Sequence, residues 1–137
     1  MLVALDSNIF IAALSSKEKH SLNAQKLLRD ISSRKNQATA SSIVYGEIYS
    51  IHLSDQPLDL VDFFSHIDNL ATVVADDNIC LKAGELRLKY GHKLKLPDAM
   101  HLATALITKA ELFITNDELL AKISQNLIPT KTLAQLT

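Results

Sequence analysis

The sequence predicts an α/β fold, a three-layer α/β/α sandwich in which a central, mainly parallel sheet lies between helices. Short apolar runs that are typical of buried strands alternate along the chain with longer segments of helical periodicity. This alternation favours parallel pairing, with helices on both faces of the sheet. The chain has only three glycines and three prolines, too few turn residues for a many-stranded all-β domain. No repeat or linker divides residues 1–137, so we expect one domain.

The first strand is expected at residues 2–5, a nearly continuous apolar run that ends in Asp6. The following helix continues over residues 9–14. A second, amphipathic helix begins at Ser21 and ends near residues 34–36, because apolar residues recur there at helical spacing. Asp6 is therefore expected at the C-terminal tip of a buried strand.

The middle of the chain repeats this order. Residues 38–40 form the expected second strand, and Ser41-Ser42 would cap the next helix. Pro57 opens another helix, and residues 71–75 form the third strand. The core positions expected on the helix after Ser42 are Val44, Ile48 and Ile51.

The last third contains two longer helices. The first begins after a cap at residues 76–78 and ends at Gly91, a residue typical of helix C-termini. Pro97 starts the second, which runs from Asp98 to about residue 110 and directs Met100, Ala103 and Ile107 to the core. The remaining predicted elements are a strand at 112–115, a helix around 119–123 and an edge strand at 128–130.

Composition excludes several classes of protein. The formal net charge is −1 and the sequence pI about 6.5, which argues against overall electrostatic attraction to nucleic acid or an anionic membrane. The single cysteine, Cys80, cannot form an internal disulfide or a cysteine-based metal site, and we expect it to fill core space. No apolar run approaches the roughly 20 residues of a membrane span, and no signal peptide is apparent. We expect a cytoplasmic protein that does not bind membranes.

Four acidic residues occur where a parallel sheet would place its functional site. Asp6 and Asp117 follow predicted strands, whereas Asp98 lies in the first turn of a helix. Glu47 lies further along another helix. Sites of such sheets lie at the carboxyl ends of the strands, so the four carboxylates could meet in one crevice. Two carboxylates about 4 Å apart repel by roughly 4 kcal/mol at an effective dielectric of about 20, and a cation or a raised pKa must relieve this repulsion.

The chemistry of these residues favours a hard cation. Oxygen ligands without a zinc-like Cys or His spacing are typical of Mg²⁺, with Mn²⁺ as a substitute. Such an ion would orient and help to deprotonate a water and neutralise charge on phosphorus oxygens, which predicts phosphodiester hydrolysis. Turn formation or helix capping is the alternative for Asp6, Asp98 and Asp117. A partly buried Glu47 needs a metal or a basic partner.

Four segments resemble, in order, the motifs of the PIN-domain family, and within it the small VapC-like toxin ribonucleases of toxin-antitoxin pairs. The segments are LVALDSN at 2–8, YGEI at 45–48, LPDAMHLATA at 96–105 and FITND at 113–117. The resemblance covers essentially the whole chain and implies a PIN-like sandwich of parallel sheet and helices. It also implies an RNA endonuclease, usually a homodimer, inhibited by a cognate antitoxin. The implied Mg²⁺ or Mn²⁺ ligands are Asp6, Glu47, Asp98 and Asp117.

Further residues are expected to support this site. Asn8 and Thr115 would position waters or the carboxylates, with capping or a turn as the alternative. Residues 36–81 contain no Lys or Arg, whereas five basic residues precede Asp98 closely. Among these we expect Arg87 and Lys95 to contact RNA phosphates, and a solvated helix face is the alternative.

His101 follows Asp98 by three residues and so shares its helical face. We interpret it as a packing histidine, with RNA contact or proton donation at the edge of the site as the alternative. Tyr45 and Tyr49 flank Glu47 and could stack a base, although core or dimer packing is the expected role.

Three other functions remain open from the sequence. A PIN-like nuclease could process RNA rather than act as a toxin, and a non-catalytic module could bind metal or a basic partner. An aspartate-nucleophile phosphatase would use Asp6. Such sites resemble Asp-x-Asp, however, and this chain has Asn8 at the second position.

Overall fold

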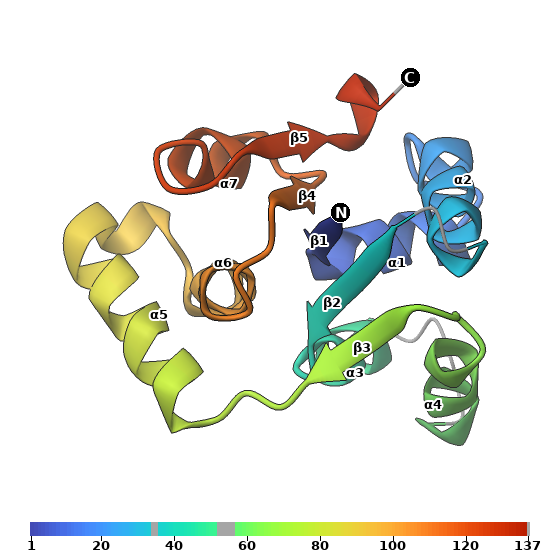
Figure 1. Cartoon of the computed structure of the whole chain (residues 1–137), viewed down its shortest axis with the longest axis horizontal. Helices are drawn as coiled ribbons and strands as arrows, with labels where there is room; N and C mark the ends of the chain where they lie inside the picture. The colour runs from blue at the N-terminus through green and yellow to red at the C-terminus, as the bar shows by residue number, and fades with distance from the viewer. Residues whose placement is uncertain (34–35, 52–56, 137) are drawn as a thin grey trace.

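The computed structural model describes residues 1–33, 36–51 and 57–136 of the chain. In these ranges five strands form one sheet in which every neighbouring pair is parallel. The strands stand in the spatial order β3-β2-β1-β4-β5 (Figure 1). Their bounds are β1 Leu2–Leu5, β2 Gln37–Ser41, β3 Leu70–Val73, β4 Leu112–Thr115 and β5 Thr130–Thr132.

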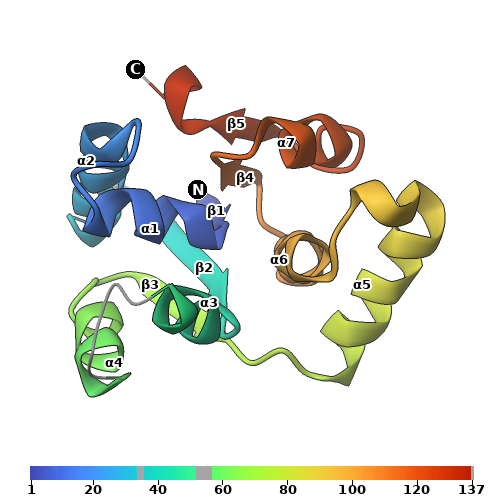
Figure 2. The same cartoon turned by 180° about the vertical axis from the view of Figure 1, so that it is seen from behind.

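Helices cover both faces of this sheet. Among the described residues, α1 to α4 pack on one face and α5 to α7 on the other (Figures 1 and 2). The predicted α/β/α arrangement is therefore confirmed. The bounds are α1 Ser7–Leu14, α2 Ser21–Ser32, α3 Val44–Ser50, α4 Pro57–Ser65, α5 Asp77–Tyr90, α6 Leu96–Ile107 and α7 Glu118–Ser124, with short 3-10 turns η1 Gly91–Lys93 and η2 Leu133–Gln135.

Side-chain alternation along the strands builds two cores. Val3 and Leu5 of β1 pack with α1 to α4, whereas Ala4 packs with α5 and α6. On β4, Ile114 belongs to the first core and Phe113 to the second. Each of these five side chains is at most 2% exposed. Full burial of a Val, Leu, Ile or Phe side chain contributes roughly 1.5–3 kcal/mol, which fixes the central strands between the two helical layers.

The order of the strands creates a switch point beside β1. From β1 the chain adds β2 and β3 on one side, and it then returns to place β4 on the other side of β1 (Figure 1). In open parallel sheets, ligand sites lie outside the carboxyl ends of the strands at such a reversal. The carboxyl ends of β1 and β4 are therefore where this topology favours a site.

The start of α3 differs from the prediction. The sequence predicts a serine cap, but α3 begins at Val44 after Ile43, which makes no side-chain cap. Ser41 is the last residue of β2. The hydroxyl of Ser42 instead accepts a hydrogen bond from the backbone N–H of Ala75 at 3.2 Å. This bond ties the end of β2 to the segment after β3.

The two edge strands are displaced from their predicted positions. The third strand is β3 at Leu70–Val73 rather than 71–75, and the last is β5 at Thr130–Thr132 rather than 128–130. Pro129 lies before β5, and its carbonyl accepts a hydrogen bond from the N–H of Phe113 at 2.9 Å. A proline has no N–H with which to continue a ladder, so it suits this position at the beginning of an edge strand.

Three residues predicted for the core are exposed. Cys80 lies on an exposed part of α5. Ile51, just beyond the end of α3, is 48% exposed, and Ile107, the last residue of α6, is 44% exposed. Periodicity predicts which face of a helix is apolar, but at a helix end the neighbouring layer no longer covers that face.

Other helix ends agree with the sequence. Asp76 caps α5, because its carboxylate accepts a hydrogen bond from the N–H of Ile79 at 3.0 Å. Gly91, with a φ of 75°, ends the same helix in a conformation that favours glycine. Across the part of the chain that the structure describes, no helix is both long and apolar enough to cross a membrane.

Candidate active site

Asp6 lies at the switch point, directly after β1, and is only 2% exposed. It is the N-cap of α1, and its Oδ1 accepts a hydrogen bond from the N–H of Ser7 at 2.7 Å. Its Oδ2 accepts a second from the hydroxyl of Thr115 at 2.7 Å. Burial raises the pKa of Asp6, against the lowering effects of His101 and of these two hydrogen bonds.

Thr115 and Asn8 connect the ends of β1 and β4. The Thr115 hydroxyl oxygen accepts a hydrogen bond from the backbone N–H of Asp117 at 3.1 Å, while its hydrogen goes to Asp6. Asn8 reaches across from α1, and its Oδ1 accepts a hydrogen bond from the N–H of Asn116 at 2.9 Å. Both side chains thus hold the acidic segments in register.

Asp117 follows β4 and is half-buried. It caps α7, because its Oδ1 accepts a hydrogen bond from the N–H of Leu120 at 3.0 Å. The capping role that the sequence leaves open is therefore present in the structure. It does not remove Asp117 from the acidic group, because its charge contributes to the raised pKa of Asp98.

Asp98 lies in the first turn of α6 and is half-buried. Burial, followed by the negative charges of Asp6, Asp117 and Glu47, raises its pKa to about 6, while His101 opposes the shift. Two of the carboxylates that act on it follow β1 and β4, and the third is on α3. The structure therefore brings all four predicted acidic residues into one electrostatic environment at the carboxyl end of the sheet.

Glu47 reaches this group from α3, with a side chain that is 31% exposed. Its Oε1 lies 2.5 Å from Nε2 of His101, which also lies 3.7 Å from Oδ1 of Asp6. His101 is 1% exposed and stands one helical turn after Asp98 on α6. Its burial agrees with the expected packing role. In addition, His101 contacts two of the acids, which packing alone does not describe.

The signal for His101 is present in the sequence. A spacing of three residues puts it on the same face as Asp98, and that face is turned toward the acidic group. Burial lowers the pKa of His101, but its hydrogen bond with Glu47 and the negative charge of Asp6 outweigh this effect and raise it. The imidazole is therefore a basic partner inside a predominantly acidic site.

The donor chemistry of the site fits a hard divalent cation. Within the described residues, no three His, Cys, Asp or Glu side chains already surround one point as metal ligands. The four carboxylates nevertheless supply oxygen donors of the kind that Mg²⁺ prefers. Their repulsion, which contributes to the raised pKa of Asp98, is the unfavourable interaction that such a cation would relieve.

The two predicted RNA contacts differ from each other. Lys95 is exposed immediately before α6. Arg87 is half-buried, and its Nε–H donates a hydrogen bond to the carbonyl of Leu94 at 2.9 Å. Arg87 therefore braces the turn between α5 and α6, whereas nothing comparable restrains Lys95 among the hydrogen bonds of the described residues.

An apolar groove of about 590 Å³ opens next to Glu47. Its walls come from α3, α5 and the start of α6, and Glu47 is both a wall residue and a member of the acidic group. The lining residues are Ile43, Gly46, Glu47, Cys80, Leu96, Pro97 and Met100.

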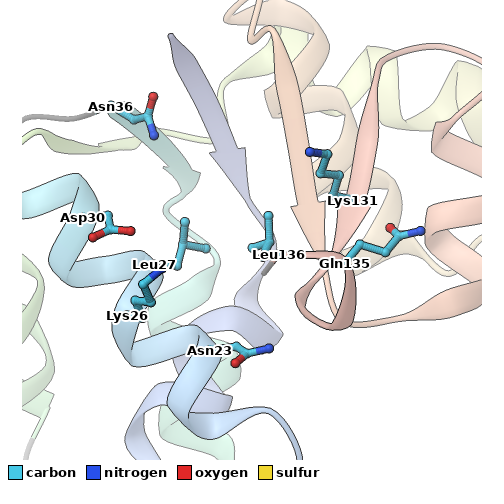
Figure 3. Close-up of a pocket in the computed structure, with 8 residues that line it drawn as sticks. All are labelled: Asn23, Lys26, Leu27, Asp30, Asn36, Lys131, Gln135 and Leu136. Carbon is cyan, nitrogen blue, oxygen red and sulfur yellow. The ribbon is translucent and has the colours of Figure 1, made fainter.

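A different pocket, of about 330 Å³, lies between α2 and the β5–η2 segment (Figure 3). Lys26 and Asp30 of α2 face it from one side and Lys131 of β5 from the other. None of the four acidic residues lines it. We therefore do not connect it with the site at the end of β1.

Comparison with known proteins agrees with this fold. A family model described as PIN domain matches residues 3–126. No curated protein matches the chain.

Solved structures of toxin-antitoxin systems are also similar. A toxin-antitoxin complex from Klebsiella pneumoniae contains a chain with 24% identity and a TM-score of 0.69, covering 96% of this chain and 97% of that one. A chain of VapBC2 from Rickettsia felis, bound to a DNA fragment from its promoter, has 22% identity and a TM-score of 0.67, and the match covers 96% of this chain and 98% of that one. The sarcin-ricin loop cleaving toxin VapC20 of Mycobacterium tuberculosis has 12% identity and a TM-score of 0.72, and the match covers 92% of this chain and 95% of that one. At such identities the likeness concerns the fold.

Proposed function

The chain belongs to the PIN-domain family, whose members are typically nucleases, and from this premise we propose that it is a Mg²⁺- or Mn²⁺-dependent endoribonuclease. We further propose that it is the toxin of a toxin-antitoxin pair. The fold similarity to chains from VapBC complexes supports this assignment. The residues proposed to hold the cation are Asp6, Glu47, Asp98 and Asp117.

One observation carries the proposal. The negative charges of Asp6, Asp117 and Glu47, which come from three other parts of the chain, help to raise the pKa of Asp98 to about 6, after the effect of burial. A fold maintains such repulsion at a cost, and capping explains only Asp6 and Asp117. Glu47 already has His101 as a basic partner. Asp98 neither caps a helix nor has a side-chain hydrogen bond or ion pair among the described residues, so its place in this group is best explained by a ligand of opposite charge.

Several residues of the chain have separate proposed roles in phosphodiester hydrolysis. When bound, a divalent cation would orient a water and neutralise charge on the phosphoryl oxygens. Thr115 and Asn8 hold the segments that carry Asp6 and Asp117. Lys95 stands free to bind a phosphate next to Asp98, because it is exposed at the start of the same helix.

An unpaired base can be accommodated beside the scissile bond. The apolar groove shares Glu47 with the acidic group, so a nucleotide whose phosphate lies at the carboxylates could place its neighbour's base in the groove. The groove offers Ile43, Leu96 and Pro97 as apolar contacts for that base. This arrangement favours single-stranded or looped RNA, in which bases are free to leave a stack.

The proposed partners are a cognate antitoxin and a second copy of the chain. The similar chains from Klebsiella and Rickettsia were crystallised in toxin-antitoxin complexes, the latter also with DNA. On α5, Leu81 is 70% and Leu88 is 89% exposed, and they are two turns apart on one face. Exposed Gly84 and Glu85 lie between them on this side of α5, and we propose that the two leucines contact a second copy of the chain in a homodimer.

The rival phosphatase assignment requires Asp6 to attack phosphorus. Sites of that class resemble Asp-x-Asp, whereas this chain has Asn8 at the second position, where its Oδ1 accepts a hydrogen bond from the N–H of Asn116. Asn8 cannot supply the second carboxylate, and a water molecule is therefore the proposed nucleophile.

The test is cleavage of labelled single-stranded RNA by the purified chain, freed of any bound antitoxin by unfolding and refolding. We expect cleavage with Mg²⁺ or Mn²⁺, none with a chelator, and none by Asp6→Asn. RNA that remains intact under all conditions would instead support a non-catalytic binding module. Accumulation of a covalent aspartyl phosphate would support the phosphatase.

A second experiment separates a toxin from an RNA-processing enzyme. The chain is expressed in cells alone and together with its neighbouring open reading frame, and growth and RNA fragments are compared. A toxin arrests growth only without its antitoxin. Cleavage in vitro without growth arrest would assign the nuclease to RNA processing.

A further inference from the structure

We propose that His101 is a positioning residue, which holds the carboxylate of Glu47 at the acidic group through a hydrogen bond from its Nε2–H. The inference rests on the proposed function and extends it, because it assigns a role to a residue outside the four carboxylates.

The aspartates after β1 and β4 are fixed by hydrogen bonds at the ends of their own strands. Asp6 accepts hydrogen bonds from Ser7 and Thr115, and Asp117 accepts one from the N–H of Leu120. Both side chains are also short, so each has only two side-chain torsions to restrain.

Glu47 has no comparable anchor in its own helix. Among the described residues, the single hydrogen-bond partner of its carboxylate is Nε2 of His101, at 2.5 Å. A glutamate has three side-chain torsions and loses more conformational freedom than an aspartate when it is ordered. Its position in the site therefore depends on a donor from another element.

His101 is well suited to supply that donor. It is 1% exposed on α6, a helix that packs against β1, β2 and β4, so its ring is held by the core. An ionised carboxylate can only accept hydrogen bonds, which requires the hydrogen to be on Nε2. The other ring nitrogen, Nδ1, is buried and has no hydrogen-bond partner among the described residues. Nε2 is therefore the ring nitrogen that contacts the acidic group.

His101 also brings Glu47 close to a second acid. Its Nε2 lies 3.7 Å from Oδ1 of Asp6, so one ring nitrogen contacts both an acid of α3 and the acid that follows β1. A carboxylate held in this way needs little further ordering when a cation arrives. Donors that fix a ligating group in this manner typically change metal affinity 10- to 100-fold when they are removed.

The experiment compares His101→Gln with His101→Met by calorimetric titration of the purified, metal-free chain with Mn²⁺. The two replacements have nearly the same shape, but only Gln retains an N–H donor. We expect His101→Met to weaken Mn²⁺ binding by about 10- to 100-fold and His101→Gln by only a few-fold. Thermal unfolding of both variants verifies the fold, and His101→Leu replaces the Met variant if that one does not fold.

A double-mutant cycle shows whether the effect passes through Glu47. In a Glu47→Ala background we expect His101→Met to cause little further loss of Mn²⁺ affinity, because the group it positions is absent. Equal Mn²⁺ affinity of wild type and His101→Met would overturn the inference. An undiminished loss in the Glu47→Ala background would do the same, because it would show a general structural role.

Failure of the proposed function gives a different result. A wild-type chain that neither binds Mn²⁺ nor cleaves RNA removes both the nuclease assignment and the role of His101. A wild-type chain that binds Mn²⁺ and cleaves RNA, with a His101→Met variant that matches it in both, leaves the nuclease in place and removes only the inference.

Discussion

The hydroxyl of Thr115, at the end of β4, donates a hydrogen bond to Oδ2 of Asp6, at the end of β1, over 2.7 Å. The same hydroxyl oxygen accepts a hydrogen bond from the backbone N–H of Asp117 at 3.1 Å. One side chain therefore links the acids that follow the two strands at the switch point. Thr115 is fully buried, so water cannot replace these bonds without a change in the core.

This relationship predicts that Thr115→Val destabilises the protein and reduces RNA cleavage. Valine has nearly the same shape, but it leaves Oδ2 of the buried Asp6 without its donor. Loss of one partner of a buried polar group costs roughly 1–3 kcal/mol. Urea denaturation measures the change in the free energy of unfolding. Thr115→Ser retains the hydroxyl and should remain close to wild type, whereas equal stability of the Val variant would show that the hydrogen bond contributes nothing.

The raised pKa of Asp98 predicts that Asp98→Asn stabilises the metal-free protein, whereas its proposed role as a cation ligand predicts that the same variant does not cleave RNA. The folded state binds the Asp98 proton more tightly than the unfolded state, whose pKa is near the usual 3.8. Stability that depends on this proton is therefore lost as the pH rises through about 4 to 6. Above pH 6 the ionised carboxylate destabilises the fold by roughly 1–2 kcal/mol, because one pKa unit corresponds to about 1.36 kcal/mol and solvent around the half-buried side chain screens part of the shift.

Thermal unfolding in a chelating buffer at pH 4.5 and pH 7.5 measures this effect. The stabilisation of Asp98→Asn over wild type should be small at the lower pH and larger at the higher pH, and it should not increase further above pH 7.5. Asp77→Asn is a suitable control, because Asp77 also lies in the first turn of a helix and is exposed. An equal gain at both pH values would contradict the electrostatic explanation.

Lys95 is expected to bind an RNA phosphate, so Lys95→Ala should weaken RNA binding in an Asp98→Asn background that does not cut. The slope of log affinity against log salt should fall by about one, because one fewer phosphate is neutralised. Lys109→Ala provides the matched control, because Lys109 is exposed just beyond the other end of α6. Fluorescence anisotropy with labelled RNA measures both slopes, and identical slopes would remove Lys95 from the interface.

The alternation of strands and helices and the acidic residues at the strand ends could be inferred from local patterns. A parallel strand that ends in an aspartate, such as the segment before Asp6, needs no long-range information to be recognised. The same holds for the capping roles of Asp76 and Asp117. Strand ends and helix caps are decided by a few neighbouring residues, and the sequence displays those residues directly.

Local patterns did not predict features that depend on how one helical layer or helix packs against another. Cys80 and Ile107 have apolar character at helical positions but meet solvent, because no element covers these positions. His101 shares a helical face with Asp98, yet its contact with Glu47 depends on how α3 packs against α6. No local spacing specifies that packing. The predictions from sequence were therefore most reliable for features that residues of one element, or of adjacent strands, decide.

The groove beside the acids leads to the last prediction, which concerns Gly46. A Cβ at this position would have no heavy atom within 4 Å outside the adjacent residues and the backbone of its own helix, so the first carbon of a side chain meets open space. Gly46 lies on α3 at the wall of the groove. We expect Gly46→Leu to occupy the groove, raise the KM for single-stranded RNA and leave Mn²⁺ binding unchanged.

Gly46→Ala separates the filled groove from the change in the helix. Both variants remove a glycine from α3, which should stabilise the helix by up to about 1 kcal/mol, but alanine leaves most of the groove open. The Ala variant should therefore retain nearly the wild-type KM. If Gly46→Leu cleaved RNA with an unchanged KM, the base would lie elsewhere. If both variants raised the KM equally, the cause would be the altered α3 backbone, because the small methyl group of alanine occupies little of the groove.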